Sequence, residues 1–242
     1  SLSPDALRLK SGVDIGGSAL FLEGYFTVQE ESSQLAARVL GPKKGQRVLD
    51  MCAAPGGKTT HLAQLMENTG TIRASDIYDH KIKLINENAQ RLGIQIIEAD
   101  KKDALRWGED APNQFDAILL DAPCSGLGVL NRRLDSASRK AEADIAALAL
   151  LQRAMLSSAY WALKNGGRLV YSTCTLSDAE NKDNVTWFLK EYPAMKPVSF
   201  AAAIPNLNGE EQEQAEKGVL ELLPFRHETD GFFLALFEKV KP

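Results

Sequence analysis

The amino-acid sequence predicts an α/β fold, in which helices cover a mostly parallel sheet and antiparallel strands form its C-terminal edge. Short apolar runs alternate with helical patterns from about residue 46 to 190, which is typical of parallel strands joined by helices. Residues 218–223 and 231–240 then have the composition of two strands separated by Pro224 and a polar turn, which favours an antiparallel edge. With 242 residues, 44% of them hydrophobic and 25% charged, the chain is long enough to bury a substantial core.

The expected elements follow from the positions of apolar runs and glycines. Residues 1–45 are expected to form a lead-in segment with a helix over 34–40, and residues 46–242 the main domain. Parallel strands are predicted at 47–51, 71–76, 94–99, 115–121 and 168–173, and helices at 58–67, 80–92, 141–163 and 179–190. Gly93 and the pair Gly166-Gly167 stop two of these helices. Residues 204–218 are acidic and poor in aromatic side chains, so a mobile loop is expected there.

Composition and charge argue against several classes of protein. The net charge of −4 is not that of a protein that binds nucleic acid over its whole surface, so such a role would need a local patch. No run approaches the ~20 apolar residues that span a bilayer, and no signal peptide opens the sequence. The cysteines Cys52, Cys124 and Cys174 lack the spacing of metal ligands. We therefore expect a cytoplasmic protein with no membrane segment and no metal, and, since no heptad run requires a dimer, a monomer.

A glycine-rich turn follows the first expected strand, in Met51-Cys-Ala-Ala-Pro-Gly-Gly-Lys-Thr-Thr60. The end of this turn, Gly57-Lys58-Thr59, matches a phosphate-binding loop, and the apolar strand that ends at Asp121 resembles the magnesium-binding strand of ATPases. A phosphate-binding loop also requires a glycine five residues before Gly57, where this sequence has Cys52. An ATP-binding protein is therefore an alternative that the turn only half supports.

Acidic residues follow the expected strands and indicate a different ligand. Asp76 comes after the second strand, twenty residues beyond Gly56, where a carboxylate can accept hydrogen bonds from the hydroxyls of a ribose. Asp100 follows the third strand and could receive the amino group of an adenine, and Asp121 follows the fourth. Such a rim would repel a triphosphate, but it suits S-adenosylmethionine, which carries a sulfonium and an ammonium group. The sequence thus favours a methyl-donor site.

Cys124 and Cys174 each come directly after an expected strand, so both should open onto the same cleft. An isolated cysteine is more often a small buried apolar residue, and this is our interpretation of Cys52. Two strand-end thiols with Lys58 nearby favour nucleophilic chemistry, because a cation lowers the pKa of a thiol. Methylation of C5 of a cytosine needs such a nucleophile, since a thiolate must add at C6 before C5 can attack a methyl group.

The sequence resembles the RNA cytosine-C5 methyltransferases through four motifs that together span most of residues 25–240. They are Asp50-Met-Cys-Ala-Ala-Pro-Gly-Gly-Lys58, Leu120-Asp-Ala-Pro-Cys-Ser-Gly126, Tyr171-Ser-Thr-Cys-Thr175 and Thr229-Asp-Gly-Phe-Phe233. The resemblance implies a Rossmann-like, S-adenosylmethionine-dependent methyltransferase fold with a mostly parallel seven-stranded sheet. It is strongest to the catalytic domain of the bacterial enzymes that act on 16S ribosomal RNA. Transfer RNA is the alternative substrate, and a non-catalytic RNA-binding scaffold is an alternative of another class.

The resemblance also implies roles for individual residues. Cys174 is implied as the nucleophile, and Cys124 as the second cysteine, which helps to release the methylated RNA. Asp121 and Lys58 are implied to position and protonate the target base. The residues implied to line the methyl-donor site are Cys52, Ala53, Ala54, Pro55, Gly56, Gly57, Lys58, Asp76, Asp100 and Asp121.

Two features depart from the family pattern. Family members commonly follow the Pro-Cys motif with two arginines and a segment that contains proline, whereas this sequence has Asn131-Arg-Arg-Leu134 and no proline there. Full-length relatives also carry an N-terminal helical RNA-binding domain that has no counterpart in these residues. A different loop conformation, and either a truncated chain or another way of finding RNA, are therefore expected.

The basic residues after Cys124 are equally compatible with RNA contacts and with a solvated face. These residues are Arg132, Arg133, Arg139 and Lys140.

Several other residues have competing interpretations. Phe232 and Phe233 could form a wall of the substrate pocket, although at least one of them is expected in the core. His61 and His80 are expected on helix surfaces, and His227 is a candidate substrate-side residue. The pair Glu180-Asn181 is expected to cap the following helix rather than to do chemistry.

Overall fold

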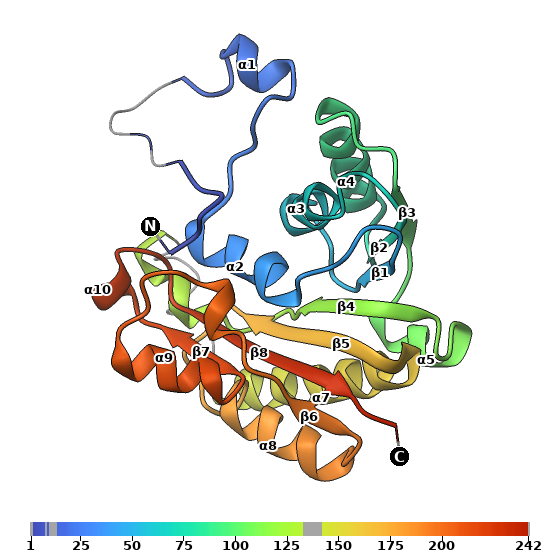
Figure 1. The fold of residues 1–242 in the computed structure, drawn as a ribbon, viewed down its shortest axis with the longest axis vertical. Helices are drawn as coiled ribbons and strands as arrows, with labels where there is room; N and C mark the ends of the chain where they lie inside the picture. Colours follow the sequence, from blue (N-terminus) through green and yellow to red (C-terminus); the bar gives the residue numbers. More distant parts are fainter. Residues whose placement is uncertain (1, 8, 10–13, 133–141, 242) are drawn as a thin grey trace.

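The computed structural model describes residues 2–7, 9, 14–132 and 142–241, and it contains one mixed sheet (Figure 1). The strands are β1 (Arg47–Asp50), β2 (Thr71–Asp76), β3 (Ile97–Lys101), β4 (Phe115–Asp121), β5 (Leu163–Thr173), β6 (Met195–Pro197), β7 (Val219–Leu222) and β8 (Phe232–Lys239). The α-helices are α1 (Ala19–Leu22), α2 (Glu31–Leu40), α3 (Gly57–Leu65), α4 (Asp79–Arg91), α5 (Trp107–Asp110), α7 (Glu142–Ala162), α8 (Lys182–Glu191), α9 (Gly209–Glu216) and α10 (Pro224–His227). Short 3-10 turns are η1 (Ala104–Arg106), η2 (Leu127–Arg132) and η3 (Ala201–Ala203).

The strand order is β3-β2-β1-β4-β5-β8-β6, and β7 also pairs with β8. The strands from β1 to β5 pair in parallel, whereas β8 runs antiparallel to β5, β6 and β7. Because β7 pairs with residues 232–235 of β8 and β6 with residues 237–239, both occupy the same edge of β8. The eight strands therefore make a sheet seven strands wide, with the predicted antiparallel C-terminal edge.

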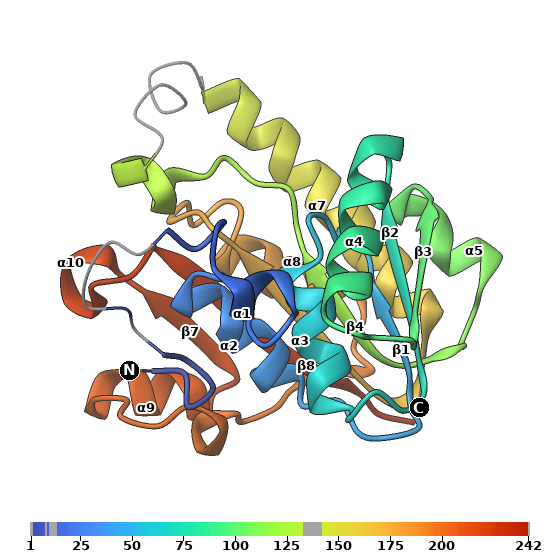
Figure 2. The same ribbon diagram turned by 90° about the horizontal axis from the view of Figure 1, so that it is seen from above.

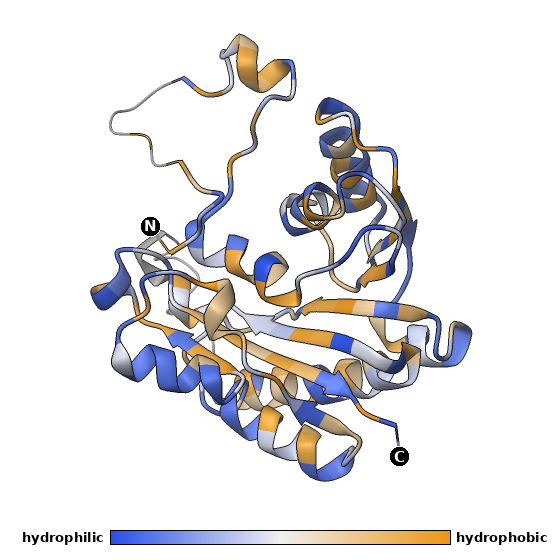
Figure 3. Cartoon of the chain, in the orientation of Figure 1, coloured by the Kyte–Doolittle hydropathy of each residue, from blue (hydrophilic) through white to orange (hydrophobic). Residues whose placement is uncertain are grey.

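Alternating side chains of the strands supply two cores, one on each face of the sheet. On one face, Val48, Leu119 and Leu234 pack with α2, α3 and α9. On the other face, Leu49, Leu120 and Ala235 pack with α5, α7 and α8. Figure 1 shows the two helical layers on opposite sides of the sheet, Figure 2 shows them from above, and Figure 3 shows apolar residues concentrated along the strands. This alternation is what a sheet buried on both faces requires.

The lead-in segment contributes to the core that contains Val48 and Leu119. Helix α2 begins at Glu31 rather than at residue 34, and its Leu35 and Leu40 are 0% and 1% exposed. It packs against α3 and against β4, β5 and β8. Arg91, the last residue of α4, anchors the stretch that precedes α2, because its guanidinium donates to the carbonyl oxygens of Phe21 and Phe26 at 2.9 and 3.0 Å.

The structure corrects several expectations. Residues 209–216, expected within a mobile loop, form α9, which begins with a capping box between Asn208 and Glu211. The third strand is shifted to Ile97–Lys101, so Asp100 lies inside it rather than after it. His61 is buried rather than exposed and contacts Asp5, with 3.1 Å between Nε2 and Oδ2, whereas His80 is exposed as expected.

Within the described ranges, no helix is long and apolar enough to cross a membrane.

Candidate active site

The candidate site lies where β1 and β4 meet at the carboxyl ends of the parallel strands. The connections turn in opposite directions from these two neighbours, because β1 leads to β2 and β3 on one side and β4 leads to β5 on the other. Such a switch point leaves a crevice between the diverging connections, and ligands of open α/β sheets bind there. The ends of β1, β4 and β5 bring Asp50, Asp121 and Cys174 to this edge.

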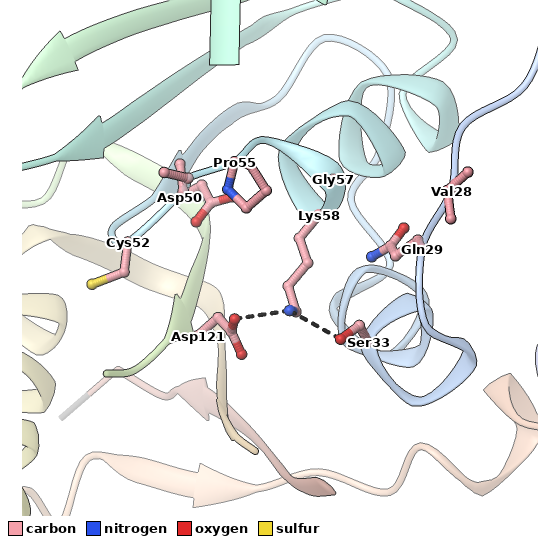
Figure 4. Close-up of a pocket in the computed structure, with 11 residues that line it drawn as sticks. Val28, Gln29, Ser33, Asp50, Cys52, Pro55, Gly57, Lys58 and Asp121 are labelled. Atoms are coloured by element: carbon pink, nitrogen blue, oxygen red, sulfur yellow. Dashed lines mark hydrogen bonds and ion pairs between the residues drawn. The ribbon is translucent and has the colours of Figure 1, made fainter. Parts of the chain in front are cut away.

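A cleft of about 200 Å³ opens at this point, which is smaller than the roughly 300–1,000 Å³ of most small-molecule sites. Its walls come from the lead-in segment, from the turn after β1 and from the end of β4 (Figure 4). The lining residues are Val28, Gln29, Ser33, Asp50, Cys52, Ala53, Ala54, Pro55, Gly57, Lys58 and Asp121.

The glycine turn brings backbone close to the cleft. Gly56 has φ of 104°, and a Cβ there would come within 3.2 Å of the Ile85 Cα on α4, so a larger residue would displace the turn. The side-chain amide of Asn88 donates to the Pro55 carbonyl oxygen at 2.9 Å and ties the turn to α4. Helix α3 begins at Gly57 and directs the free N–H groups of its first turn toward the cleft end.

Two buried polar atoms of the cleft lack a hydrogen-bond partner among the described residues, namely Oδ1 of Asp50 and Nε2 of Gln29. Asp50 is 1% exposed, and its Oδ2 accepts a hydrogen bond of 2.7 Å from the Thr59 hydroxyl. Burial raises the pKa of the Asp50 carboxyl to about 7. The cleft therefore offers one acceptor and one donor whose hydrogen-bonding capacity is unused.

Lys58 and Asp121 form an ion pair at the side of the cleft nearest the cysteines. The Lys58 Nζ lies 2.8 Å from Oδ2 of Asp121 and 3.4 Å from the Ser33 hydroxyl, as the dashed lines in Figure 4 show. The Ser172 hydroxyl donates to the other oxygen of Asp121 at 2.8 Å. Phe232 lies beneath the ammonium, 5.5 Å from Nζ to the ring centre. Both charged groups are thus held in fixed positions.

The thiols of Cys124 and Cys174 meet beside this ion pair, with 3.2 Å between their sulfur atoms. The pKa of Cys174 is lowered because its thiolate can accept a hydrogen bond from the Cys124 thiol, an effect that outweighs burial and the Asp121 carboxylate, which both raise this pKa, while the Lys58 ammonium opposes them. The same contact raises the pKa of Cys124, and burial adds to this effect. Cys174 is therefore the thiol that ionises more readily.

The other predicted residues are placed differently. Gly56, Asp76 and Asp100 are not among the residues that line the cleft. Asp76, at the end of β2, is 7% exposed and lies 3.1 Å from the Lys81 Nζ. Asp100 is half-exposed and forms an ion pair with Arg73. Both belong to the strands that continue this edge of the sheet beyond β1.

The structure supports a non-catalytic role for Cys52 and places both Phe232 and Phe233 in the core. Burial strongly raises the pKa of the half-buried Cys52 thiol, which makes it unreactive. Phe232 and Phe233 are each 1% exposed and belong to the cores on opposite faces of the sheet. His227 forms hydrogen bonds with Glu211, with 2.7 Å between Nε2 and Oε1, and with the backbone of Leu223. These contacts link α9 to α10.

Sequence reasoning missed part of the site. Val28, Gln29 and Ser33 line the cleft from a segment with no regular apolar pattern, so no sequence signal identifies them. Asn181 occupies the N-cap position of α8 without a capping side-chain bond, and binds Thr173 and Thr175 instead. Glu180 is completely buried. Arg133, Arg139 and Lys140 lie outside the described residues, and Arg132 ends η2.

In the part of the chain that the structure describes, no group of three or more His, Cys, Asp and Glu side chains could hold a metal ion.

Solved structures of other proteins share the fold of this chain. NSun6 from Pyrococcus horikoshii, solved with SFG, superposes with a TM-score of 0.82 at 39% identity, over 94% of this chain and 56% of that one. A methyltransferase homolog protein from Pyrococcus horikoshii gives a TM-score of 0.80 at 34% identity, over 95% and 73% of the two chains.

The sequence comparisons identify the family. The family described as 16S rRNA methyltransferase RsmB/F matches residues 37–238 of this chain. A probable ribosomal RNA small subunit methyltransferase B of Bacillus subtilis is 43% identical over 240 residues, which is 98% of this chain and 53% of the relative. Ribosomal RNA small subunit methyltransferase F of Cronobacter sakazakii is 39% identical over 233 residues, 95% and 48% of the two chains. The chain belongs to the 16S rRNA methyltransferase RsmB/F family, and it spans about half the length of these curated relatives.

Proposed function

We propose that this chain transfers a methyl group from S-adenosylmethionine to C5 of a cytosine in RNA, and that the RNA is 16S ribosomal RNA. The observation that carries the proposal is the pair of thiols, 3.2 Å apart, beside the Lys58–Asp121 ion pair. Cytosine C5 methylation needs a nucleophile and a separate group that assists elimination, and these two strand-end cysteines can supply both. Family membership supports the choice of ribosomal RNA.

The chemistry of the cleft suits S-adenosylmethionine. The unpartnered Asp50 Oδ1 can accept a hydrogen bond from an ammonium group, and the unpartnered Gln29 Nε2 can donate one to a carboxylate. An amino acid end of a ligand carries both groups. The N-terminus of α3 and the glycine turn can approach the rest of the ligand closely. The remaining members of the proposed set, Asp76 and Asp100, would contribute from the adjoining strands. When bound, this cofactor supplies an electrophilic methyl group.

The residues of this chain would then act in order on the base. The Asp121 carboxylate can accept from the amino group of a cytosine while the Lys58 ammonium donates to its ring nitrogen N3. The Cys174 thiolate would add to C6, the electrons of the C5–C6 double bond would move to C5, and C5 would take the methyl group as the bond from that group to the donor's sulfonium sulfur breaks and its electron pair stays on the sulfur. A base then removes the C5 proton, the C5–C6 double bond re-forms, and the bond between C6 and Cys174 Sγ breaks. Cys124, which contacts the departing sulfur, is placed to assist this last step.

The experiment that tests the proposal uses 5-fluorocytidine, because fluorine at C5 cannot leave as a proton. The chain is mixed with S-adenosylmethionine and 16S ribosomal RNA fragments carrying this base, and the covalent adduct is mapped by peptide mass spectrometry. We expect an adduct at Cys174, none with Cys174→Ala, and accumulation of an adduct on ordinary RNA with Cys124→Ala.

An adduct at Cys124 would reverse the two roles. Binding of S-adenosylmethionine is measured separately by calorimetry, so a failure to bind the donor can be told from a failure of the chemistry. A transfer RNA transcript is included, and preferential reaction with it would overturn the assignment of the RNA. Donor binding without any adduct on either RNA would contradict the proposed reaction for this chain.

A further inference from the structure

Glu180 is a completely buried carboxylate that the proposed chemistry does not use. It lies between β5 and α8, and three hydrogen bonds reach its two oxygens. The backbone N–H and the hydroxyl of Ser125 donate at 2.9 and 2.5 Å, and the side-chain amide of Gln152 donates at 2.8 Å. A buried carboxylate is costly unless it is fully hydrogen-bonded, and these donors compensate for its burial.

The partners of Glu180 adjoin the two reactive cysteines. Ser125 directly follows Cys124, and its hydroxyl lies 2.7 Å from that of Thr175, which directly follows Cys174. A chain of hydrogen bonds therefore runs from Thr175 through Ser125 to Glu180. It joins the loop after β4 to the loop after β5 at the residues that directly follow the two cysteines.

Other members of this network hold the opposite side of each cysteine. Gln152 Nε2 also donates to the carbonyl oxygen of Pro123, at 2.9 Å, just before Cys124. Asn181 accepts from the Thr173 hydroxyl at 2.6 Å and donates to the Thr175 carbonyl oxygen at 2.9 Å, on either side of Cys174. Each cysteine is thus held at both of its neighbours in the sequence.

The hydrogen bonds of Glu180 cannot be rearranged freely. The Gln152 Oε1 already accepts from the Tyr171 hydroxyl at 3.1 Å and from the Asn184 amide at 2.9 Å. Its Nε2 must therefore face Glu180. A glutamine at 180 could still accept from the Ser125 N–H and Gln152 and donate to the Ser125 hydroxyl, which would then donate to Thr175. A leucine at 180 has no polar atom and removes all three hydrogen bonds. Only a carboxylate accepts from all three.

We propose that Glu180 is a positioning residue, which holds Cys124 in contact with Cys174 by binding the residue that follows Cys124. This inference rests on the proposed function of the two cysteines. Glu180 touches neither sulfur, so its effect passes through the loop after β4. Releasing that loop would separate the thiols and remove the hydrogen bond that favours the Cys174 thiolate.

The test compares Glu180→Leu with Glu211→Leu, a change at a second buried glutamate, which belongs to the α9 capping box and contacts His227. Three quantities are measured for each variant and for the unmodified chain. They are kcat and KM for S-adenosylmethionine with an RNA fragment, the pH dependence of Cys174 alkylation by iodoacetamide, and the thermal unfolding temperature.

Glu180→Leu is expected to lower kcat about 100-fold, the size of effect that a displacement of about 1 Å at a reacting group can cause. KM for the donor should stay within about twofold, because the cleft does not include residue 180. Alkylation of Cys174 should shift to higher pH. Glu211→Leu should leave the alkylation profile and kcat unchanged even where it lowers the unfolding temperature equally. Glu180→Asp, which keeps the charge, should recover part of the loss.

An unchanged kcat or an unchanged alkylation profile in folded Glu180→Leu would overturn the proposal. If that variant does not fold, Ser125→Ala and Thr175→Val interrupt the same chain one bond at a time and carry the same expectations. The alkylation profile does not depend on methyl transfer. A chain without activity but with a shifted profile would therefore contradict the proposed function while supporting the role of Glu180.

Discussion

Asp50 is a buried carboxyl group that accepts a hydrogen bond from the Thr59 hydroxyl. Among the described residues, no lysine or arginine forms an ion pair with it. Its folded-state pKa of about 7 lies above the ordinary value of 3.8. The folded protein therefore binds more protons than the unfolded chain between these two values, and the stability contributed by this group falls as pH rises from 3.8 to 7. Above the folded pKa, the full cost of a buried charge is present.

Replacing Asp50 with asparagine should remove this pH dependence. Relative to the unmodified chain, Asp50→Asn should gain stability between pH 5 and pH 8 on the order of 2 to 3 kcal/mol, as the difference between the two titrations requires. Urea unfolding at the two pH values measures it, and any constant cost of the amide cancels.

Asp79→Asn is the matched control for this measurement. Asp79 is fully exposed, and its pKa is lowered by a hydrogen bond from Lys101, so its contribution is already complete above pH 3.8 and should not change between pH 5 and 8. An equal stability difference for Asp50→Asn at both pH values would contradict the raised pKa.

The lead-in segment forms one wall of the cleft, and Arg91 at the end of α4 fixes its position. The Arg91 guanidinium, which donates to the carbonyl oxygens of Phe21 and Phe26, also stacks over the Phe21 ring at 4.0 Å from the ring centre. Val28 and Gln29, which line the cleft, follow a few residues later. Anchoring of this stretch by α4 therefore limits how far the two lining residues can move.

Arg91→Ala should weaken the binding of S-adenosylmethionine about tenfold, because one hydrogen bond from a charged donor contributes about 1.5 kcal/mol. Calorimetric titration of the chain gives the Kd. Lys83→Ala is a suitable control, since Lys83 is an exposed residue of the same helix that pairs only with Glu87 in the structure. A Kd that is the same in both variants would show that the segment does not need this anchor.

For the molecule as a whole, the sequence is sufficient to predict the parallel strands β1 to β5 in their order along the chain and the edge of the sheet where the site lies. The last residues of all parallel strands lie at the same edge, so the sequence alone places Asp121, Cys124 and Cys174 together. The antiparallel C-terminal edge was also correct, because the break at Pro224 separates two runs that pair as β7 and β8.

What the sequence did not reveal depends on contacts between distant segments. Helix α9 was missed because its polar composition resembles a loop, and the capping box that starts it depends on a side-chain geometry at Asn208 and Glu211. Glu180 was interpreted as part of a cap, although its partners Ser125 and Gln152 are 55 and 28 residues away in sequence. No periodicity of apolar residues records a buried polar network.

The short distance between the two thiols also makes the site sensitive to oxidation. Sulfur atoms 3.2 Å apart need to approach by only about 1.2 Å to reach the bond length of a disulfide, about 2.05 Å. With hydrogen peroxide, the Cys174 thiolate would take one oxygen to give a sulfenic acid, and attack by Cys124 would expel water and close the S–S bond. Peroxide treatment should therefore remove two hydrogen atoms from the intact mass and abolish alkylation of both cysteines, and dithiothreitol should restore them. Oxidation that instead leaves Cys124 free to alkylate would show that the pair does not close, whereas closure would make the same contact a switch set by the oxidants around the protein.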